Sequence, residues 1–310
     1  MTAALARRRR VPEFTGYRRG SGHMTVGLAE KVIASPRFHR YRGQVQLILT
    51  SPPFPLNRRK RYGNLQGDEY KDWLASFAPI FLDLLTPTGS IVLEVGNAWE
   101  PKRPVMSTLT IESLLAFLKR GNLNLCQQFI AHNPARLPSP VQWVNIDRVR
   151  VKDSFTHIWW MSATDHPKAN NRQVLTEYSA QMKALLRRGS YNTGRRPSEH
   201  IIGDESFLTD NGGAIASNVL EHSNTMSSDF YRQYCLDQDL PVHPARMPTG
   251  ISKFFIEFLT SPGDLVLDPF AGSNTTGAVA HALKRKWIAI EADAAYAQGS
   301  LGRFLDASTT

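Results

Sequence analysis

Cysteine is scarce in this sequence. Among 310 residues only Cys126 and Cys235 occur, and neither has a second cysteine or a histidine at metal-ligand spacing. We therefore expect no structural zinc site and no bound metal. So few cysteines also suit a reducing compartment, which favours a cytoplasmic protein.

Long apolar runs are missing as well. No stretch reaches the length of about 18 apolar residues that a helix needs to cross a membrane, so we expect no membrane span. The arginine run Arg7–Arg10 is not followed by an apolar segment, so it does not have the pattern of a secretion signal.

Acidic residues are outnumbered by basic ones. The chain has 37 Lys and Arg against 27 Asp and Glu, a formal net charge of +10. Such a surplus favours a polyanionic partner, with nucleic acid ahead of a membrane surface. Residues 1–24 include the arginine run, and we expect them to form a basic flexible arm that is either solvated or in contact with phosphates.

The apolar residues that are present follow the alternation of an α/β protein. Residues 44–50 and 90–96 are nearly continuous apolar runs, as in strands that are buried on both faces of a parallel sheet. Between them, residues 67–85 repeat apolar side chains at helical spacing, which predicts an amphipathic helix with Asp68 as its N-cap. A strand, a helix and a strand in this order form a right-handed parallel unit.

The alternation resumes on both sides of a polar region. Residues 163–242 are rich in Ser, Asn, Asp, Gly, Arg and His and lack periodicity, which predicts a small loop-rich insert. The expected fold class is therefore α/β, with a mainly parallel sheet and this insert. Further strands are predicted over 124–132, 155–162, 264–268 and 287–291, and further helices over 111–120, 251–259 and 274–284.

The first predicted strand ends in an unusual sequence, Thr-Ser-Pro-Pro-Phe. Pro52 and Pro53 cannot donate backbone hydrogen bonds, and they fix the chain in an extended turn after Ser51. Carbonyl groups at this turn then lack ladder partners and can accept hydrogen bonds, together with the Ser51 hydroxyl. Phe54 offers an aromatic face. Taken alone, a proline pair is more often a simple strand breaker, so its meaning depends on the rest of the chain.

A second motif follows the strand predicted over 264–268. Asp268 ends that strand, at the edge of the sheet where ligands bind in α/β folds. A glycine-containing turn then leads into a helix whose N-terminus favours an anionic group. The next strand ends at Glu291, about 20 residues further on, where a carboxylate suits the two hydroxyls of a ribose. The candidate cofactor-binding residues are Glu291 and the turn itself: Asp268, Pro269, Phe270, Ala271, Gly272, Ser273, Asn274, Thr275 and Thr276.

The kind of cofactor follows from what this turn lacks. G-x-G-x-x-G is absent, which disfavours a dinucleotide and hence a nicotinamide-dependent dehydrogenase. No Gly-Lys-Ser/Thr occurs there either, which disfavours a phosphate-cradling loop. A nucleoside cofactor without a pyrophosphate fits better, and S-adenosylmethionine is such a molecule.

Together, the two motifs resemble those of the amino-group DNA methyltransferases of the β, circularly permuted, class, in the N4-cytosine branch that carries Ser-Pro-Pro-Phe/Tyr. The catalytic motif comes first, the cofactor motif comes last, and the sequence His-Pro-Ala-Arg-Met-Pro precedes the cofactor strand. The resemblance spans residues 45 to 305. It implies the Rossmann-like fold of S-adenosylmethionine-dependent methyltransferases, a mainly parallel twisted sheet with helices on both faces.

The resemblance also implies an activity, the site-specific transfer of a methyl group from S-adenosylmethionine to the exocyclic N4 amine of a cytosine flipped out of double-stranded DNA. Such enzymes belong to restriction–modification systems, and the resemblance leaves open whether this chain forms a homodimer or has a cognate restriction endonuclease. Relatives that methylate adenine at N6 usually carry Asp or Asn in place of Ser51, so N6-adenine methylation is the alternative. A non-catalytic DNA-binding protein on the same scaffold is a second alternative.

The amine of cytosine is a poor nucleophile because its lone pair is delocalised into the ring. Its attack needs acceptors aimed at its protons, which the turn at Ser51 supplies. Glu94 ends the neighbouring predicted strand and would lie beside Ser51, so we expect it to accept the proton directly or through Ser51. Phe54 would stack on the flipped base. The candidate catalytic residues are Ser51, Pro52, Pro53, Phe54 and Glu94.

Two positions depart from the pattern of the family. Asn274 stands where relatives have a second glycine, and asparagine adopts a left-handed conformation more readily than most residues. Relatives often carry an acidic residue shortly before the catalytic strand, whereas His23 is in roughly that place here.

The resemblance divides the chain into the arm 1–24, a catalytic half 25–162, a target-recognition region 163–242 and a cofactor-binding half 243–310. The recognition region carries amide and cationic side chains that can read base edges. The candidate DNA-binding residues are Arg195, Arg196, His200 and Asn211 in that region, and Arg148 and Lys152 before it.

Two adjacent tryptophans, Trp159 and Trp160, follow these last cations in a predicted strand. Alternate residues of a strand face opposite sides. We therefore expect one of the two to be a core residue and the other to be available to DNA.

Overall fold

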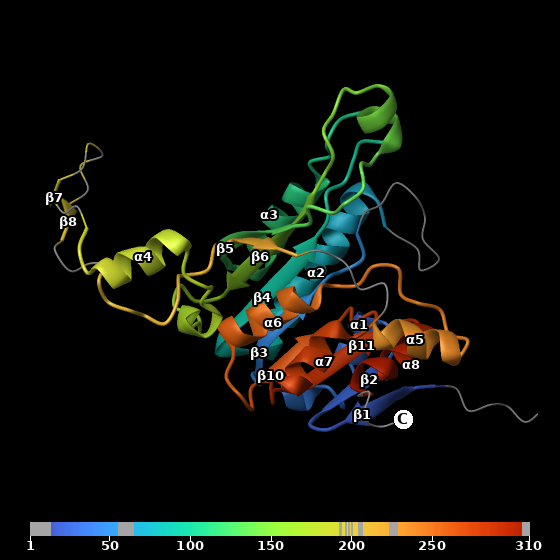
Figure 1. Ribbon diagram of the computed structural model, residues 1–310. Coiled ribbons are helices and arrows are strands. Elements are labelled where there is room, and N and C mark those ends of the chain that lie inside the picture. Colours follow the sequence, from blue (N-terminus) through green and yellow to red (C-terminus); the bar gives the residue numbers. More distant parts are fainter. Residues whose placement is uncertain are drawn as a thin grey trace, which may run out of the picture.

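The computed structural model describes residues 14–54, 65–191, 194–195, 197, 199, 201–203, 207–222 and 229–305. These residues form one large sheet with helices packed on both faces (Figure 1). No helix in this part of the chain is long and apolar enough to cross a membrane. Within the same residues, no three His, Cys, Asp or Glu side chains gather in a group that could hold a metal ion.

Seven of the nine strands of the sheet run in the same direction. β2, β11, β10, β3 and β4 are parallel neighbours. β6 is antiparallel to both β4 and β5, which brings β5 and its parallel partner β9 back to the common direction, and β1 pairs antiparallel with β2 at the opposite edge. Across the sheet the strands are β1 (Gly16–Arg19), β2 (Gly22–Val26), β11 (Lys286–Glu291), β10 (Leu265–Asp268), β3 (Val45–Thr50), β4 (Leu85–Val95), β6 (Phe155–Ser162), β5 (Asn124–His132) and β9 (Val219–Glu221).

Each face of the sheet carries its own hydrophobic core. Alternate residues of a strand enter different cores: Ile48 of β3 packs in one, and Leu47 and Leu49 pack in the other. Because both faces are covered, these strands are continuously apolar in sequence. The first core is covered by α1 (Ala29–Ile33), α2 (Gly67–Leu84) and α3 (Leu109–Gly121), and the second by α6 (Thr249–Leu259), α7 (Thr275–Ala282) and α8 (Ala294–Gly299).

Parts of the polar region between β6 and α6 pack against the rest of the fold. β9 joins the main sheet, and α5 (Phe230–Asp237) packs against α8 and the 3-10 helix η5 (Ser300–Phe304). By contrast, α4 (Ala180–Arg188) and the paired strands β7 (Gly194–Arg195) and β8 (Ile201–Ile202) project away from the sheet (Figure 1). The remaining short turns are η1 (His39–Tyr41), η2 (Gln142–Ile146) and η3 (Asn171–Val174).

Residues 16–24 depart from the flexible arm that the sequence predicted. β1 and β2 form a hairpin, and β2 pairs in parallel with β11. Gly22 allows this because a Cβ there would lie 2.2 Å from the Trp287 ring, and Met24 is buried. An edge hairpin with exposed basic side chains has the composition of a solvated arm, which explains the error. The arginine run lies outside the described residues.

Two expected side-chain roles are also wrong. Gln66, not Asp68, occupies the N-cap of α2, and Asp68 lies in the first turn, where it pairs with Lys71. Trp159 and Trp160 are both buried, one in each core, because helices cover both faces of β6. Neither tryptophan is therefore available to stack on DNA.

Candidate active site

The two sequence motifs meet at one edge of the sheet. Because β3, β4, β10 and β11 are parallel, Ser51, Glu94, Asp268 and Glu291 lie at or next to strand ends along the same edge. The Thr50 hydroxyl donates a hydrogen bond to Asp268 Oδ1 at 2.6 Å. This bond joins the strand of the Ser-Pro-Pro-Phe motif directly to the strand of the glycine turn.

Glu94 is a buried carboxyl group beside Ser51. Its side chain accepts hydrogen bonds from the Thr156 hydroxyl at 3.0 Å and from the Ser51 hydroxyl. Burial raises the pKa of Glu94 above its ordinary value, and these hydrogen bonds and the charge of Arg136 oppose the rise only in part. A carboxylate with a raised pKa is a better proton acceptor than an exposed one.

The turn after β10 contains two residues in the left-handed conformation, Gly272 at φ 51° and Asn274 at φ 56°. A Cβ on Gly272 would lie 2.9 Å from the His243 ring, so glycine is required for this close packing. Asn274 caps α7 by accepting a hydrogen bond from the Gly277 N–H at 3.1 Å, and its amide donates to Tyr17 Oη at 3.0 Å. The asparagine thus adopts the left-handed conformation that the sequence suggested.

The acidic residues on either side of this turn are also shielded from water. Burial raises the pKa of Asp268 to about 6, against hydrogen bonds from Thr50 and the Phe270 N–H. Burial likewise raises the pKa of Glu291, against hydrogen bonds from the backbone N–H groups of Asp293 and Gly272. The Gly272 N–H donates to Glu291 Oε2 at 2.7 Å, so the turn and the end of β11 are held together.

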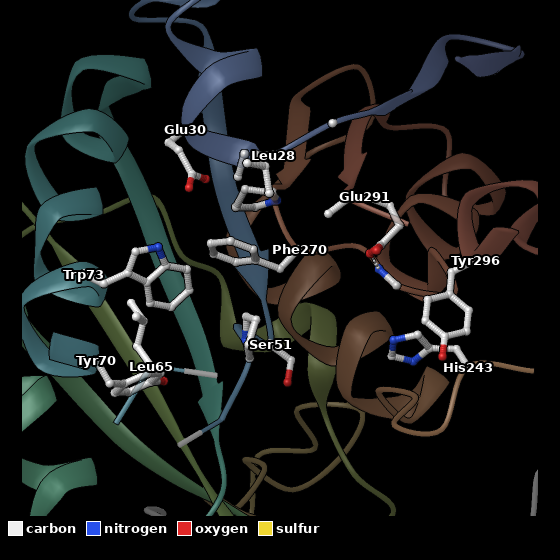
Figure 2. Close-up of a pocket in the computed structure, with 16 residues that line it drawn as sticks. Leu28, Glu30, Ser51, Leu65, Tyr70, Trp73, His243, Phe270, Glu291 and Tyr296 are labelled. Carbon is white, nitrogen blue, oxygen red and sulfur yellow. Dashed lines mark hydrogen bonds between the residues drawn. The ribbon is translucent and has the colours of Figure 1, made fainter. Parts of the chain in front are cut away.

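A cavity of about 250 Å³, which we call the turn cavity, opens between the turn and α2 (Figure 2). In this view Tyr70, Trp73 and Leu65 form one side, Glu291, Tyr296 and His243 form the other, and Ser51 and Phe270 lie between them. The start of α1 contributes Leu28 and Glu30. The cavity therefore combines apolar walls with a few polar groups, as small-molecule sites do.

A second cavity of about 310 Å³, the edge cavity, also borders Ser51. Its walls include Phe54, Glu94, Thr156 and His222. A small cavity of about 60 Å³, which Ser51, Phe54 and Asp268 help to line, lies by the turn. Ser51 borders all three cavities.

The remaining residues of the predicted motifs are distributed around these cavities. Pro53 faces the turn cavity, and the Phe54 ring packs on Gly96, where a Cβ would lie 2.9 Å from it. Of the turn, Pro269 and Phe270 line the turn cavity, whereas Asn274 lines none of the three cavities. The small cavity is lined by Pro52, Ala271, Ser273, Thr275 and Thr276.

The predicted DNA-binding residues that the structure describes line neither the turn cavity nor the edge cavity. Lys152 donates to the carbonyl oxygens of Pro134 and Arg136, and the Asn211 side chain donates to the carbonyl oxygen of Thr209. Arg148 is exposed at the loop before β6 and has a left-handed backbone. Only the backbone of Arg195 is described, and Arg196 and His200 lie outside the described residues.

Several cavity residues were not assigned from the sequence. Tyr70 and Trp73 belong to the apolar helical spacing of residues 67–85, which by itself predicts only an amphipathic helix. His243 belongs to the His-Pro-Ala-Arg-Met-Pro sequence, which was the one available signal for it. His23 does not line the turn cavity, and Glu30 is instead the acidic residue that reaches it from before the catalytic strand.

This arrangement can bring two substrates together. The turn cavity offers glycine-turn backbone and a ribose-compatible carboxylate, and the edge cavity offers Phe54 and a buried proton acceptor. A group held in one cavity can be transferred to an atom held in the other at Ser51. The geometry thus suits group transfer between a nucleoside-like donor and a flat acceptor.

Comparison with known proteins shows which family has this arrangement of residues. The DNA methylase model of the N6/N4 methyltransferases matches residues 45–301. The chain is 43% identical to the type II methyltransferase M.PvuII of Proteus hauseri over 264 residues, which are 84% of this chain and 78% of that protein.

Solved structures agree. The PvuII DNA methyltransferase, described as cytosine-N4-specific, superposes with a TM-score of 0.74 at 35% identity. The match covers 94% of this chain and 89% of that one. A DNA modification methylase of Thermus thermophilus, solved with S-adenosyl-L-methionine, has a TM-score of 0.54 at 21% identity, with 91% of this chain and 92% of that one covered. This second likeness concerns the fold alone.

Proposed function

The chain belongs to the N6/N4 DNA methylase family, and from this premise we propose that it transfers a methyl group from S-adenosylmethionine to the N4 amine of a cytosine in double-stranded DNA. The observation that carries the proposal is the position of Ser51, which borders the turn cavity and the edge cavity at once. The specificity is supported by the similarity to the PvuII enzyme, which is cytosine-N4-specific.

The turn cavity suits S-adenosylmethionine, which when bound supplies a methyl group on a positively charged sulfur. Glu291 can accept hydrogen bonds from the two ribose hydroxyls at the end of β11. Gly272 lines the same cavity with its backbone and is joined there to Glu291 by a hydrogen bond. Asp268 holds the strand end through its bond to Thr50 and orients the turn.

The edge cavity suits a base that has left the double helix, because chemistry on a base requires it to be flipped out of the stack. Phe54 borders this cavity and can stack on the base. Pro52 and Pro53 hold the turn in which the Ser51 hydroxyl and the nearby carbonyl groups accept from the amine. Glu94, bonded to Ser51, then takes the proton that the amine releases.

Methylation of adenine at N6 is the alternative within the family. The residue at the strand end favours cytosine, since N6 enzymes usually have Asp or Asn where this chain has Ser51. The same machinery of a stacked base and hydrogen-bond acceptors would serve both amines, so only identification of the product separates the two reactions.

The DNA partner also explains the net charge of +10. We assign base reading to the region 163–242 with Arg195, Arg196, His200 and Asn211, and phosphate contacts to Arg148 and Lys152. A DNA substrate and the scarcity of cysteine support a cytoplasmic location. Sedimentation with and without DNA tests whether the chain forms a homodimer, and a nuclease that cuts the same unmethylated site would identify a restriction partner.

The deciding experiment is methylation of a random-sequence DNA library by the purified protein. The library is then sequenced by a method that distinguishes N4-methylcytosine from N6-methyladenine. We expect N4-methylcytosine at one short sequence and no product with the Ser51→Ala variant. N6-methyladenine as the product, or no product from wild-type protein that binds the cofactor, would contradict the proposal.

A further inference from the structure

Tyr70 carries a buried hydroxyl group that has no hydrogen-bond partner within the described part of the chain. The residue lies in the first turn of α2 and is only 1% exposed. Buried hydroxyl groups are almost always satisfied in folded proteins, because leaving one unpaired is unfavourable. The motifs that carry the proposed function leave this group unused.

The residue that carries the unpaired hydroxyl lies in the wall of the turn cavity. Tyr70 lines it together with Leu65 and Trp73, and its ring lies 5.7 Å from that of Trp73. The helix is fixed in the core by neighbours such as Leu74 and Phe77, which are fully buried. The ring is thus held in place at the wall of a ligand site. Its hydroxyl oxygen is covered in the ligand-free fold, so a ligand reaches it when a neighbouring side chain at that wall moves aside.

The chemical state of the hydroxyl defines what it can do. Burial raises the pKa of Tyr70 above its ordinary value, so the group keeps its proton at neutral pH. It therefore acts as a hydrogen-bond donor, and its natural partner is an oxygen acceptor on the ligand. Among the described residues that line the cavity, none is Lys or Arg, so an anionic group on the ligand would meet no cation there.

The position of Tyr70 selects the part of the ligand. Three groups diverge from the sulfur of S-adenosylmethionine: the methyl group, the ribose with its adenine, and the amino-acid chain. The methyl group must face Ser51, and the ribose is assigned to Glu291. In Figure 2, Tyr70 and Glu291 lie on opposite sides of Ser51, so Tyr70 is on the side left to the amino-acid chain.

We propose that the Tyr70 hydroxyl binds the amino-acid end of S-adenosylmethionine by donating a hydrogen bond to its carboxylate. This proposal rests on the proposed function, since it requires that cofactor in the turn cavity. A carboxylate is the strongest hydrogen-bond acceptor on the molecule, and such charge-assisted bonds are stronger than neutral ones. Tyr70 would then anchor the chain whose sulfur presents the methyl group to Ser51.

The test compares two ligands on two proteins. S-adenosylhomocysteine has the amino-acid end, whereas 5′-methylthioadenosine keeps the adenosine and sulfur but lacks it. By calorimetry, Tyr70→Phe should weaken binding of S-adenosylhomocysteine by about 5- to 30-fold and that of 5′-methylthioadenosine by less than about twofold. The Tyr41→Phe variant, whose hydroxyl pairs with Arg40 outside the cavity, should bind both ligands like wild type.

Thermal unfolding of the ligand-free proteins separates binding from folding. Because the hydroxyl is unpaired in the fold, Tyr70→Phe should unfold at the wild-type temperature or above it, whereas a structural hydroxyl would lower that temperature. Equal losses for both ligands, or no loss for either, would overturn the inference. If wild-type protein binds neither ligand, the proposed function itself fails, which is a different result from a normal wild type with an unaffected variant.

A second measurement needs no variant. Wild-type protein should bind the decarboxylated analogue of S-adenosylhomocysteine more weakly than S-adenosylhomocysteine itself, by a factor similar to that of Tyr70→Phe. The Tyr70→Phe protein should bind both with nearly the same affinity. A variant that still prefers the carboxylate as strongly as wild type would rule Tyr70 out as its partner.

Discussion

Glu94 and Asp268 are two buried carboxyl groups on the two strands that flank β3, and burial raises the pKa of both. Their hydrogen bonds differ in purpose. Glu94 accepts from Ser51, which borders both cavities, so it can exchange a proton with a substrate. Asp268 accepts from Thr50 and the Phe270 N–H within the fold, so it orders the turn.

The role of Glu94 predicts a pH dependence. Only the ionised carboxylate can accept a proton, so the single-turnover methylation rate should rise with pH as Glu94 loses its own proton. Because burial raises its pKa, this rise should occur above the range of an exposed glutamate. Glu94→Gln keeps the shape and accepts the Ser51 hydrogen bond, and we expect a rate lower by about 10²-fold or more without that rise.

The control for Glu94→Gln is binding of S-adenosylhomocysteine, which should be unchanged because Glu94 does not line the turn cavity. A variant that retains the wild-type pH profile would show that another group takes the proton.

Asp268 predicts a pH dependence of stability. Its folded pKa of about 6 lies above the value of about 3.9 in an unfolded chain. The folded protein therefore favours protonated Asp268. The contribution of this proton to the free energy of unfolding is fully present below about pH 4 and is lost as pH rises through 6. This amounts to about 2–3 kcal/mol. Urea denaturation of ligand-free wild type should show the loss, and Asp268→Asn should lack it; parallel curves for both proteins would contradict the assignment.

At this scale the sequence located some site residues and not others. Glu94 was placed beside Ser51 because parallel strands that pair end at the same edge, which is a rule of geometry. Tyr70 could not be found in this way, since a tyrosine on an apolar helix face has the same spacing whether its hydroxyl is paired or not. Glu30 was missed because its role depends on where α1 lies in space.

Among the elements, the N-terminal hairpin is joined by a hydrogen bond to the start of α7. Tyr17 of β1 accepts a hydrogen bond from the Asn274 amide and shares another with Ser300 at 2.7 Å. Asn274 in turn caps α7 and stands in the turn that follows Asp268. The hairpin therefore supports the turn from a position far away in sequence.

The Tyr17→Phe variant tests this support. The ring packing against Trp287 and Phe304 is kept, and only the hydrogen bonds are lost. We expect unfolding free energy lower by about 1–2 kcal/mol and weaker binding of S-adenosylhomocysteine, because the cap of α7 loosens. An unchanged affinity in a destabilised protein would limit the hairpin to a role in folding.

Secondary structure was predicted well for the inner strands of the sheet and poorly for the hairpin at its edge. β5 and β6 begin and end where the sequence predicted because their apolar residues are bounded by polar turns. The hairpin of β1 and β2 was missed because an edge strand needs little apolar surface. The expectation that one of Trp159 and Trp160 is open to DNA is wrong because α6 covers the face of Trp160, through Phe258, from a distant part of the chain.

For the whole molecule, the net charge of +10 predicts binding to DNA that depends strongly on salt. Each phosphate contact contributes about −0.9 to the slope of log K against log salt. We expect the affinity for DNA to fall by roughly tenfold or more when salt rises fourfold.

Arg148→Gln should reduce the slope by about one phosphate contact, whereas the control Lys119→Gln, at the end of α3, should leave the slope unchanged. The same slope in wild type and both variants would remove Arg148 from the interface.

The strand order has a consequence for how the protein is made. β3 lies between β4, which follows it closely, and β10, which is synthesised more than 200 residues later. During translation, one edge of β3, the strand that precedes Ser51, therefore lacks its partner strand until almost all of the described chain has been synthesised. The active site therefore cannot form in a partly translated polypeptide. The unpaired edge of β3 is also the part most exposed to aggregation during translation, and hence a natural binding site for a molecular chaperone.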